Sequence, residues 1–392
     1  MSHMVDTRLD DPYWYQLDQH AGRFGRAGVF AVHAEDARWH FVRGALHRAG
    51  QAAARLLQPI LRAGHLEQKM YVLNIHMAPG STIRIPGYKM ALSSYPAFVQ
   101  STDDFYIISS GLAAGETTIG NSNRSLFELV SPVGQVLEYA RAMIANRLAR
   151  NGKEWCNIFK KYNSGTYNNQ WFIVDYNKFK PRTPSCNGWI KPGLLWVIEQ
   201  LPGNTEAADL TDHLKRTTYF PSYNIPYFPR MFNLSGGNVR VDTFGDWFGY
   251  HTNPRAKIIK EKQAQIMNLR DMFYTMRYND FKHDPNARCD QCSPPYSACN
   301  AIAARNDLNP ANGTYPFRAL GHRSHGATDA KITSAYLRRS YRFLSICSPT
   351  HNISRGIPPF AWSKFDMGPY VSHVGHPDEW LFPPILHDWE WV

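Results

Sequence analysis

The stretch Asn163-Ser164-Gly165-Thr166-Tyr167-Asn168-Asn169-Gln170-Trp171-Phe172-Ile173-Val174-Asp175 passes from polar turn residues directly into large apolar ones. The apolar part is short and rich in aromatic and β-branched residues, which is typical of a sheet strand. The polar part would place amide and hydroxyl groups at one rim of the sheet. Such uncharged donors are what an oxyanion site requires. Ordinary turn chemistry accounts for the same residues, so both interpretations stay open.

Further short apolar runs, separated by turn residues, predict more strands of the same sheet. These runs span 89–93, 105–109 and 194–200. Helical patterns cover 135–150, 154–162 and 254–278, the last with Pro254 well placed at a helix start. Strands and helices occur in blocks, which favours an α+β sandwich over a regular alternation of strand and helix.

The chain has 392 residues, of which 43% are apolar and 14% aromatic, so it can bury a large core and is not a disordered protein. Two regions differ in character. Residues 1–70 form an atypical N-terminal segment, rich in Ala and Arg, with apolar residues at helical spacing between Trp39 and Leu61. Residues 71–392 show no linker or repeat, which predicts a single domain.

The formal charge of +11 and the pI near 9.3 allow anionic partners. Lys and Arg are scattered rather than clustered, however, which favours a solvated basic surface and argues against a nucleic-acid partner. No apolar run is long enough to cross a membrane, and the N-terminus lacks the sections of a signal peptide.

Cys289 and Cys292 form a Cys-x-x-Cys pair inside a long stretch rich in Pro, Asn, Asp and Gly, from about 280 to 326. With His283, Cys299 and His325 nearby, a zinc site is conceivable, but the second ligand pair is irregular. A local disulfide needs no further partner and is the preferred interpretation. We therefore predict no metal and no cofactor.

Four sequons indicate a lumenal or secreted glycoprotein. Their asparagines are Asn123, Asn233, Asn312 and Asn352.

A second polar run, Pro221-Ser222-Tyr223-Asn224-Ile225-Pro226, holds Asn224 between two prolines that stiffen the backbone. Asn224 is thus a candidate hydrogen-bond donor with a fixed direction. A simple turn again explains the same residues.

These runs, together with several others, resemble the phospholipase B-like proteins, a family of N-terminal-nucleophile hydrolases, and most closely its lysosomal branch. The match covers about residues 71–385 and also 9–16. The other matching runs are Ser93-Ser94-Tyr95-Pro96, Asp103-Asp104-Phe105-Tyr106-Ile107, Glu116-Thr117-Thr118-Ile119-Gly120-Asn121, Pro254-Arg255-Ala256-Lys257, Met276-Arg277-Tyr278-Asn279-Asp280-Phe281 and Arg305-Asn306-Asp307-Leu308-Asn309-Pro310.

The resemblance implies an αββα sandwich and a precursor that is cut in two, so that a cysteine becomes the first residue of the larger chain. The free α-amino group, with an ordinary pKa of about 8, then accepts the thiol proton, and amide donors hold the oxyanion. It also implies a lipid or acyl-amide substrate, the N-terminal precursor fragment as a partner, and the lysosome lumen or secretion. It permits a homodimer.

Residue by residue, the resemblance assigns Asn224, with Asn168 and Asn169, to the oxyanion or pocket donors. Ser94 and Tyr167 would shape the pocket. Arg255 and Arg277 would orient an acidic or amide substrate, or else form structural ion pairs. We expect the two polar strand ends, around Asn168 and at Asn224, to converge on one cavity.

Residues 17–69 do not match the family, and no cysteine precedes Cys156. We hypothesise a shifted reading frame or an alternative exon here, with a genuine insert as the third option. Two functions follow: a hydrolase that uses the family cysteine, or a non-catalytic glycoprotein of the same fold that binds a partner through the old pocket. As written, the chain lacks the expected nucleophile.

Overall fold

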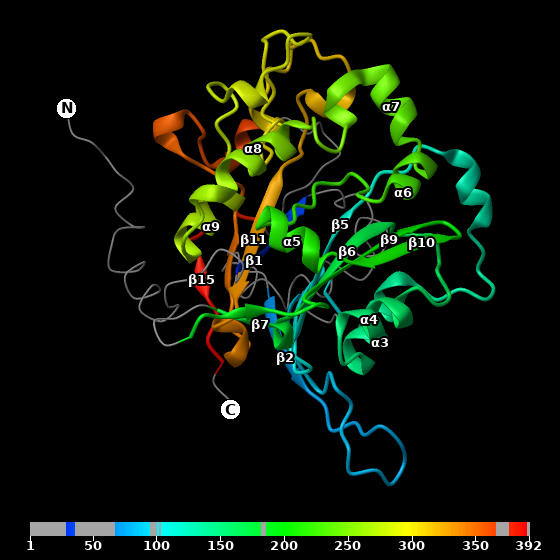
Figure 1. The fold of residues 1–392 in the computed structure, drawn as a ribbon. Helices are drawn as coiled ribbons and strands as arrows, with labels where there is room; N and C mark the ends of the chain where they lie inside the picture. Colours follow the sequence, from blue (N-terminus) through cyan, green and yellow to red (C-terminus); the bar gives the residue numbers. More distant parts are fainter. Residues whose placement is uncertain are drawn as a thin grey trace.

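The computed structural model describes residues 29–35, 67–94, 100–101, 103–181, 186–365 and 376–389 (Figure 1). The predicted N-terminal helix and the matching run 9–16 lie outside these residues. No helix in the described ranges combines the length and the apolar character needed to cross a bilayer.

The larger sheet has seven strands, and every neighbouring pair is antiparallel. Thr118 lies opposite Asn169, so the C-terminal end of one central strand meets the N-terminal end of the next. In spatial order the strands are β10 (Asn204–Asp209), β9 (Leu195–Leu201), β6 (Asn169–Asp175), β5 (Leu112–Thr118), β4 (Phe105–Ile108), β3 (Lys89–Ser94) and β2 (Glu67–Val72).

The smaller sheet has four antiparallel strands. Its order is β1 (Val29–Glu35), β11 (Ala327–Ser334), β12 (Leu344–Cys347) and β15 (Ile385–Leu386). Two short hairpins lie outside both sheets: β7 (Phe179–Lys180) with β8 (Trp189–Ile190), and β13 (Phe360–Ala361) with β14 (Glu379–Trp380).

The helices α3 (Glu138–Leu148) and α4 (Gly152–Phe159) cover one face of the seven-stranded sheet. Trp155 of α4 packs on Trp171 of β6, with ring centroids 5.0 Å apart. Both indoles are fully buried, so this contact excludes water from the outer face of the sheet.

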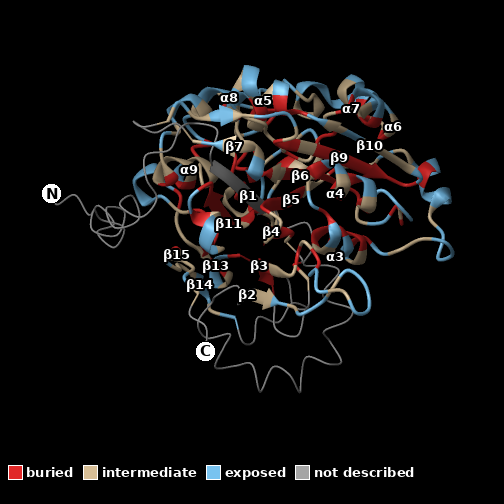
Figure 2. Cartoon of the chain, turned by 60° about the horizontal axis from the view of Figure 1, so that its bottom comes forward, coloured by how far each residue is buried: buried red, intermediate tan, exposed pale blue. Residues whose placement is uncertain are grey.

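The opposite face of the seven-stranded sheet packs on the smaller sheet. Phe105 of β4 meets Phe343, the residue before β12, at a centroid distance of 5.0 Å. On the far side of the smaller sheet, Phe273 of α9 (Leu269–Met276) belongs to a cluster with Ile332 and Leu344. The layers therefore run helix, sheet, sheet, helix, and the predicted αββα sandwich is confirmed. Figure 2 shows the burial concentrated along the inner strands.

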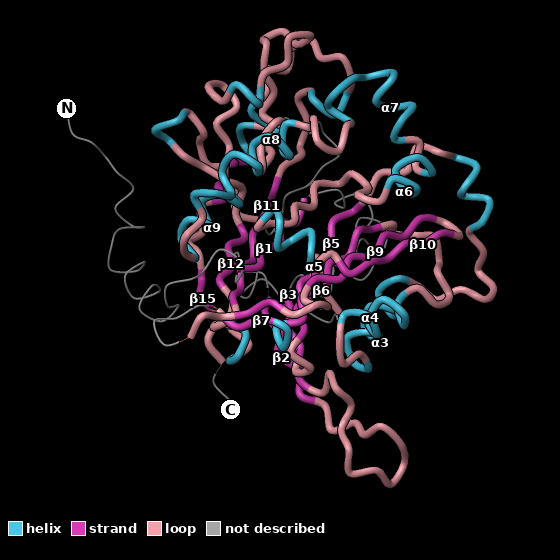
Figure 3. Tube along the Cα trace, in the orientation of Figure 1, coloured by secondary structure: helices cyan, strands magenta, loops and turns pink. Residues whose placement is uncertain are grey.

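Three further helices lie at the end of the sandwich where β5 stops (Figure 3): α6 (Pro229–Leu234), α7 (Gly237–Phe244) and α8 (Pro254–Lys262). The helix α5 (Thr211–Thr217) instead starts at the other end of the larger sheet, where the Thr211 hydroxyl accepts a hydrogen bond from the backbone N–H of Leu195 at 3.2 Å.

The single helix predicted over 254–278 is wrong in one respect, because the structure splits it into α8 and α9. A 3-10 turn at Gln263–Gln265 and an extended residue, Ile266, separate the two. The Asn268 side chain then accepts a hydrogen bond from the backbone N–H of Asp271 at 2.8 Å and starts α9. An N-cap residue of this kind favours a new helix start over continuation.

The predicted long loop is confirmed: 3-10 turns are the only helical pieces among the described residues 280–326. Buried asparagine amides hold it in place of regular structure. Asn279 donates to the carbonyl oxygens of Ala298 and Ala303, and Asn309 donates to that of Leu320 at 2.8 Å. Each amide satisfies backbone groups that no strand or helix partner satisfies.

Candidate active site

Asn224 lies in the turn between α5 and α6, where its backbone is left-handed with φ 69°. Asparagine tolerates this conformation better than most residues. Its Nδ2 donates to the carbonyl oxygen of Thr118 at 2.7 Å, and Nη1 of Arg255 donates to its Oδ1 at 2.8 Å. The amide is therefore fixed from both ends at the C-terminal edge of β5. An amide nitrogen has two hydrogens, and Thr118 takes one.

A line of hydrogen bonds leads from this turn into the space between the sheets. The Ser222 hydroxyl contacts the Thr117 hydroxyl and donates to Oε1 of Gln170. Nε2 of Gln170 in turn donates to Oε1 of Glu199 at 2.6 Å. The line thus connects the Asn224 turn to a carboxyl group buried in β9.

Glu199 is completely buried. Its carboxyl group accepts the backbone N–H groups of Tyr227 and Phe228, which immediately precede α6. Burial raises its pKa to about 7, and the hydrogen bonds from Tyr227 and Gln170 offset only part of this effect. The group therefore gains or loses its proton near neutral pH.

This raised pKa predicts that Glu199 stabilises the fold more in acid than at alkaline pH. Between its ordinary range and about 7, the folded chain holds the proton and the unfolded chain has lost it, so the contribution falls as pH rises through that window. We expect the free energy of unfolding of the native protein, minus that of Glu199→Gln, to fall by about 2–3 kcal/mol from pH 5 to pH 8. Chemical denaturation of both proteins at the two pH values measures this difference. A difference independent of pH would contradict the shift.

The Asn168 side chain forms hydrogen bonds at the turn that precedes β6. Its Nδ2 donates to the carbonyl oxygen of Gly165 at 3.0 Å, and its Oδ1 accepts from Nε2 of Gln200 at 3.3 Å. Gln200 also accepts a hydrogen bond from Arg141 of α3. The Asn168 amide is therefore occupied on the side of the sheet that faces the helices.

Asn169 is the first residue of β6, and only 1% of it is exposed. Neither its amide nitrogen nor its amide oxygen has a hydrogen-bond partner within the described part of the chain. A buried amide without partners is costly and calls for a partner or a function. Strand alternation places Asn169 on the same face as Trp171, towards the helices.

Tyr167 and Ser94 are both occupied by neighbours. The Tyr167 hydroxyl lies 2.9 Å from Oδ2 of Asp104 and 3.1 Å from Oε1 of Glu116. The Ser94 hydroxyl donates to the carbonyl oxygen of Gln100 at 2.8 Å. These contacts stabilise the edge of the larger sheet at which β4 starts and β5 ends.

The two polar groups expected to converge lie at one edge of the seven-stranded sheet but direct their side chains to different faces. Gln170 shares the face of Phe172, between the sheets, and is linked to the Asn224 turn. Asn168 and Asn169 serve the helix-covered face. The Asn168 amide is bound to Gly165 and Gln200, and the Asn224 amide to Thr118 and Arg255, so the two side chains share no hydrogen-bond partner.

The two arginines singled out from the sequence are also separate. Arg255, in the first turn of α8, holds Asn224. Arg277 ends α9 beside the smaller sheet and donates to the carbonyl oxygens of Ser348 and Pro349, at 2.6 and 3.2 Å. Arg277 is thus placed away from the Asn224 turn.

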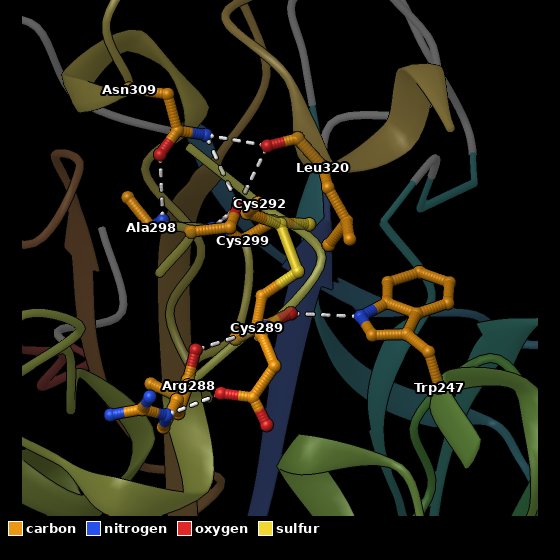
Figure 4. The surroundings of a disulfide bond; sticks show 12 residues. Trp247, Arg288, Cys289, Cys292, Ala298, Cys299, Asn309 and Leu320 are labelled. Atoms are coloured by element: carbon orange, nitrogen blue, oxygen red, sulfur yellow. Dashed lines mark hydrogen bonds and ion pairs between the residues drawn. A yellow bond between two sulfur atoms is a disulfide. The ribbon is translucent and has the colours of Figure 1, made fainter. Parts of the chain in front are cut away.

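The predicted disulfide between Cys289 and Cys292 is confirmed (Figure 4). The two Cα atoms are 5.3 Å apart, and the pair packs in one cluster with Cys299, Leu320 and Trp247. The indole of Trp247 donates to Asn300 at 2.8 Å. The bond therefore closes a local turn, and its packing in this cluster anchors that turn within the loop.

Cys156 lies on the buried face of α4, where burial raises its thiol pKa well above the ordinary value. A buried thiol with a raised pKa is a poor nucleophile, so Cys156 does not replace the missing cysteine. The backbone of β1 pairs with β11 and lies against β5. The segment without the family motif therefore runs beside the strand that supports Asn224.

The sequon asparagines all lie at the described surface. Asn233, Asn312 and Asn352 are exposed, whereas Asn123 is half-buried and donates to the carbonyl oxygen of Leu234 at 3.2 Å. Asn123 is thus the least accessible of the four sequons.

The sequence model of the family described as Phospholipase B matches residues 66–387. A Rattus norvegicus protein named "Putative phospholipase B-like 2" is 49% identical over 310 residues, covering 78% of this chain and 51% of the relative. Phospholipase B-like protein B of Dictyostelium discoideum is 39% identical, covering 76% and 47%. The chain therefore spans about half the length of these relatives.

Two solved structures overlap with the fold at low similarity. Penicillin V acylase from Agrobacterium tumefaciens gives a TM-score of 0.39 at 10% identity, covering 72% of this chain and 75% of that one. A mutant of a conjugated bile acid hydrolase from Clostridium perfringens gives 0.34 at 10% identity, covering 72% and 82%.

Proposed function

The chain belongs to the phospholipase B family, and we propose on this basis that its αββα fold serves to hydrolyse an amide or ester bond in a lipid or an acyl-amide. The substrate carbonyl would lie beside Asn224, whose remaining amide hydrogen stabilises the oxyanion. The observation that carries this proposal is the clamping of the Asn224 amide between Thr118 and Arg255. A donor that is already oriented does not have to be ordered when charge develops.

Arg255 acts in this proposal as a positioning residue, because it reaches the substrate only through Asn224. Its guanidinium donates to the amide oxygen and so fixes the plane of an amide whose nitrogen donates to Thr118. A cation on that oxygen also polarises the amide and makes its N–H groups better donors. Asn168 would contribute from the other face of the sheet, by holding the turn before β6, and Asn169 would offer there an amide that has no partner among the described residues.

The nucleophile in this proposal is the cysteine that the family places at the start of its larger chain. Its own α-amino group would accept the thiol proton. The motif would belong to the interval 17–69, and the match to the family model begins only at residue 66. The backbone of β1, inside that interval, lies against β5, so a cysteine restored there would stand near the Asn224 edge.

The test exchanges residues 17–69 for the corresponding segment of the rat relative and compares the two chains on decanoyl p-nitroanilide and p-nitrophenyl decanoate. We expect the exchanged chain to hydrolyse at least one of them, and iodoacetamide to abolish that rate. The unexchanged chain should show no turnover that depends on a thiol. Cys186→Ser is the matched control for alkylation of a different thiol. The proposal is contradicted if iodoacetamide does not lower the rate of the exchanged chain.

A second candidate function is a non-catalytic glycoprotein that binds a ligand with the same fold. The observation that favours it is the sequence itself, in which Cys156 is the first cysteine, together with the burial of that thiol. This candidate predicts saturable ligand binding without turnover in both chains of the exchange experiment.

We place the protein in the lysosome lumen or outside the cell, with the N-terminal part of its precursor as its partner. The resemblance to the lysosomal branch and the three exposed sequons support this location.

A further inference from the structure

A cavity of about 410 Å³ lies on the outer side of the smaller sheet, away from Asn224. Its walls come from three places: the end of α9, the segment that follows β12, and the residues before β15. Phe273, Leu381 and Phe382 make its apolar part. A volume of this size lies within the usual range of small-molecule sites.

The polar part of the cavity is positive. Arg277, His351 and Arg355 line it, and no aspartate or glutamate is among the lining residues. Arg355 is neutralised from behind by Asp280, which it contacts in an ion pair. The hydrogen bonds of Arg277, by contrast, go to two uncharged carbonyl oxygens.

Arg277 forms no ion pair with a carboxylate of the described residues. A guanidinium has five N–H donors, and the carbonyl oxygens of Ser348 and Pro349 take two of them. Burial lowers its pKa to about 10, the charge on Arg305 adds to this effect and the charge on Asp329 opposes it, so the group stays charged at neutral pH. A desolvated cation of this kind favours an anionic ligand that can pair with its planar fork.

We propose that this cavity is a second ligand site that binds a single-chain amphiphile with a carboxylate head group. The head group pairs with the free donors of Arg277, and the chain lies against Phe273, Leu381 and Phe382. Neither Asn224 nor Arg255 is among the residues that line the cavity. The site therefore stands independently of the hydrolase proposal, and binding can be measured on a chain without turnover.

The test is isothermal titration of the full 392-residue chain with decanoate and with decan-1-ol, which share the chain and differ in charge. We expect one saturable site for decanoate and binding of decan-1-ol weaker by about 10- to 100-fold, because a charged hydrogen-bonded pair is lost. Equal affinity for the two, or no saturable binding of decanoate, overturns the proposal.

Two variants locate the site. Arg277→Met should weaken decanoate by about 10- to 100-fold and leave decan-1-ol unchanged. Arg230→Met, which removes an exposed arginine of α6 that pairs with Glu206, is the matched control and should change neither. Because Arg277 also donates to two carbonyl oxygens, its replacement could disturb the fold as well as the site. Leu381→Trp tests the site without removing these hydrogen bonds. It fills the apolar part of the cavity and should abolish binding of both ligands. If decanoate binds Arg277→Met and Leu381→Trp as tightly as it binds the native chain, the site lies elsewhere and the proposal is overturned.

Discussion

Replacing Lys331 with methionine is expected to lower the free energy of unfolding by about 3–5 kcal/mol, since it leaves two carboxyl groups in the core without their cation. Lys331 of β11 is completely buried and contacts both Asp103 and Asp329. The hydroxyls of Ser93 and Ser101 each donate to Asp103 at 2.7 Å. The group joins the two sheets across the inner layer, so its loss affects the interface on which the sandwich depends.

The pH dependence of this effect identifies its cause. Burial raises the pKa of Asp329 to about 6 even beside Lys331, and the variant removes the cation that opposes this rise. The folded variant then binds protons that the unfolded chain has released, so its stability falls as pH rises. Urea denaturation should therefore show a larger loss at pH 8 than at pH 5.

Lys215→Met is the matched control for Lys331→Met. Lys215 pairs with Asp212 on the surface of α5 at 3.2 Å, and such exposed pairs contribute less than about 1 kcal/mol. Replacing the whole buried group, by Lys331→Met with Asp103→Leu and Asp329→Leu, should recover much of the loss, because no buried charge remains. A Lys331→Met protein as stable as Lys215→Met would contradict the assignment.

The sequence predicts the elements whose side chains carry the packing. β6 and β9 were identified from compact apolar runs, and α4 from its helical spacing, because these residues fill the two faces of the larger sheet. β5 was missed. Its sequence Leu112-Ala113-Ala114-Gly115 has small side chains with little strand character of their own. Pairing with β4 and β6 on both sides makes it a strand, and this pairing is a tertiary effect.

The candidate site was only partly predictable for a related reason. The polar composition of the turn before β6 gives no indication of which face each side chain serves, and the register of Asn169 with Thr118 decides it. Glu199 was overlooked, although a carboxylate inside the apolar run Leu195–Leu201 is a visible anomaly. A charge in the middle of a buried strand signals either a partner or a shifted pKa, and Glu199 has both.

The ionisable residues of the inner layer connect the fold to the proposed chemistry. Glu199 is linked to the Asn224 turn through Gln170 and Ser222, whereas Lys331 and its two carboxylates hold the opposing sheet. The Lys331 group lies where the two sheets meet, whereas Glu199 lies under the segment that leads into α6. The pKa values of Glu199 and Asp329 are raised to about 7 and about 6, so acidification protonates a carboxylate in each group, whereas Lys331 keeps its charge.

Asn224→Ala, introduced into the chain that carries the exchanged segment, is expected to lower kcat by about 10²- to 10³-fold and to change KM little. The reason is that the donor acts on charge that develops only in the transition state.

Arg255→Ala should lower kcat less, and Arg255→Lys should restore part of the loss, because a lysine can still reach the amide oxygen but cannot reproduce the guanidinium fork. Asn238→Ala, at an exposed position of α7, is the matched control. Steady-state kinetics with the decanoyl substrates measure all four variants. If Asn224→Ala raises KM and leaves kcat unchanged, the side chain binds the ground state, and the oxyanion would then have to be held by other donors at this edge of the sheet.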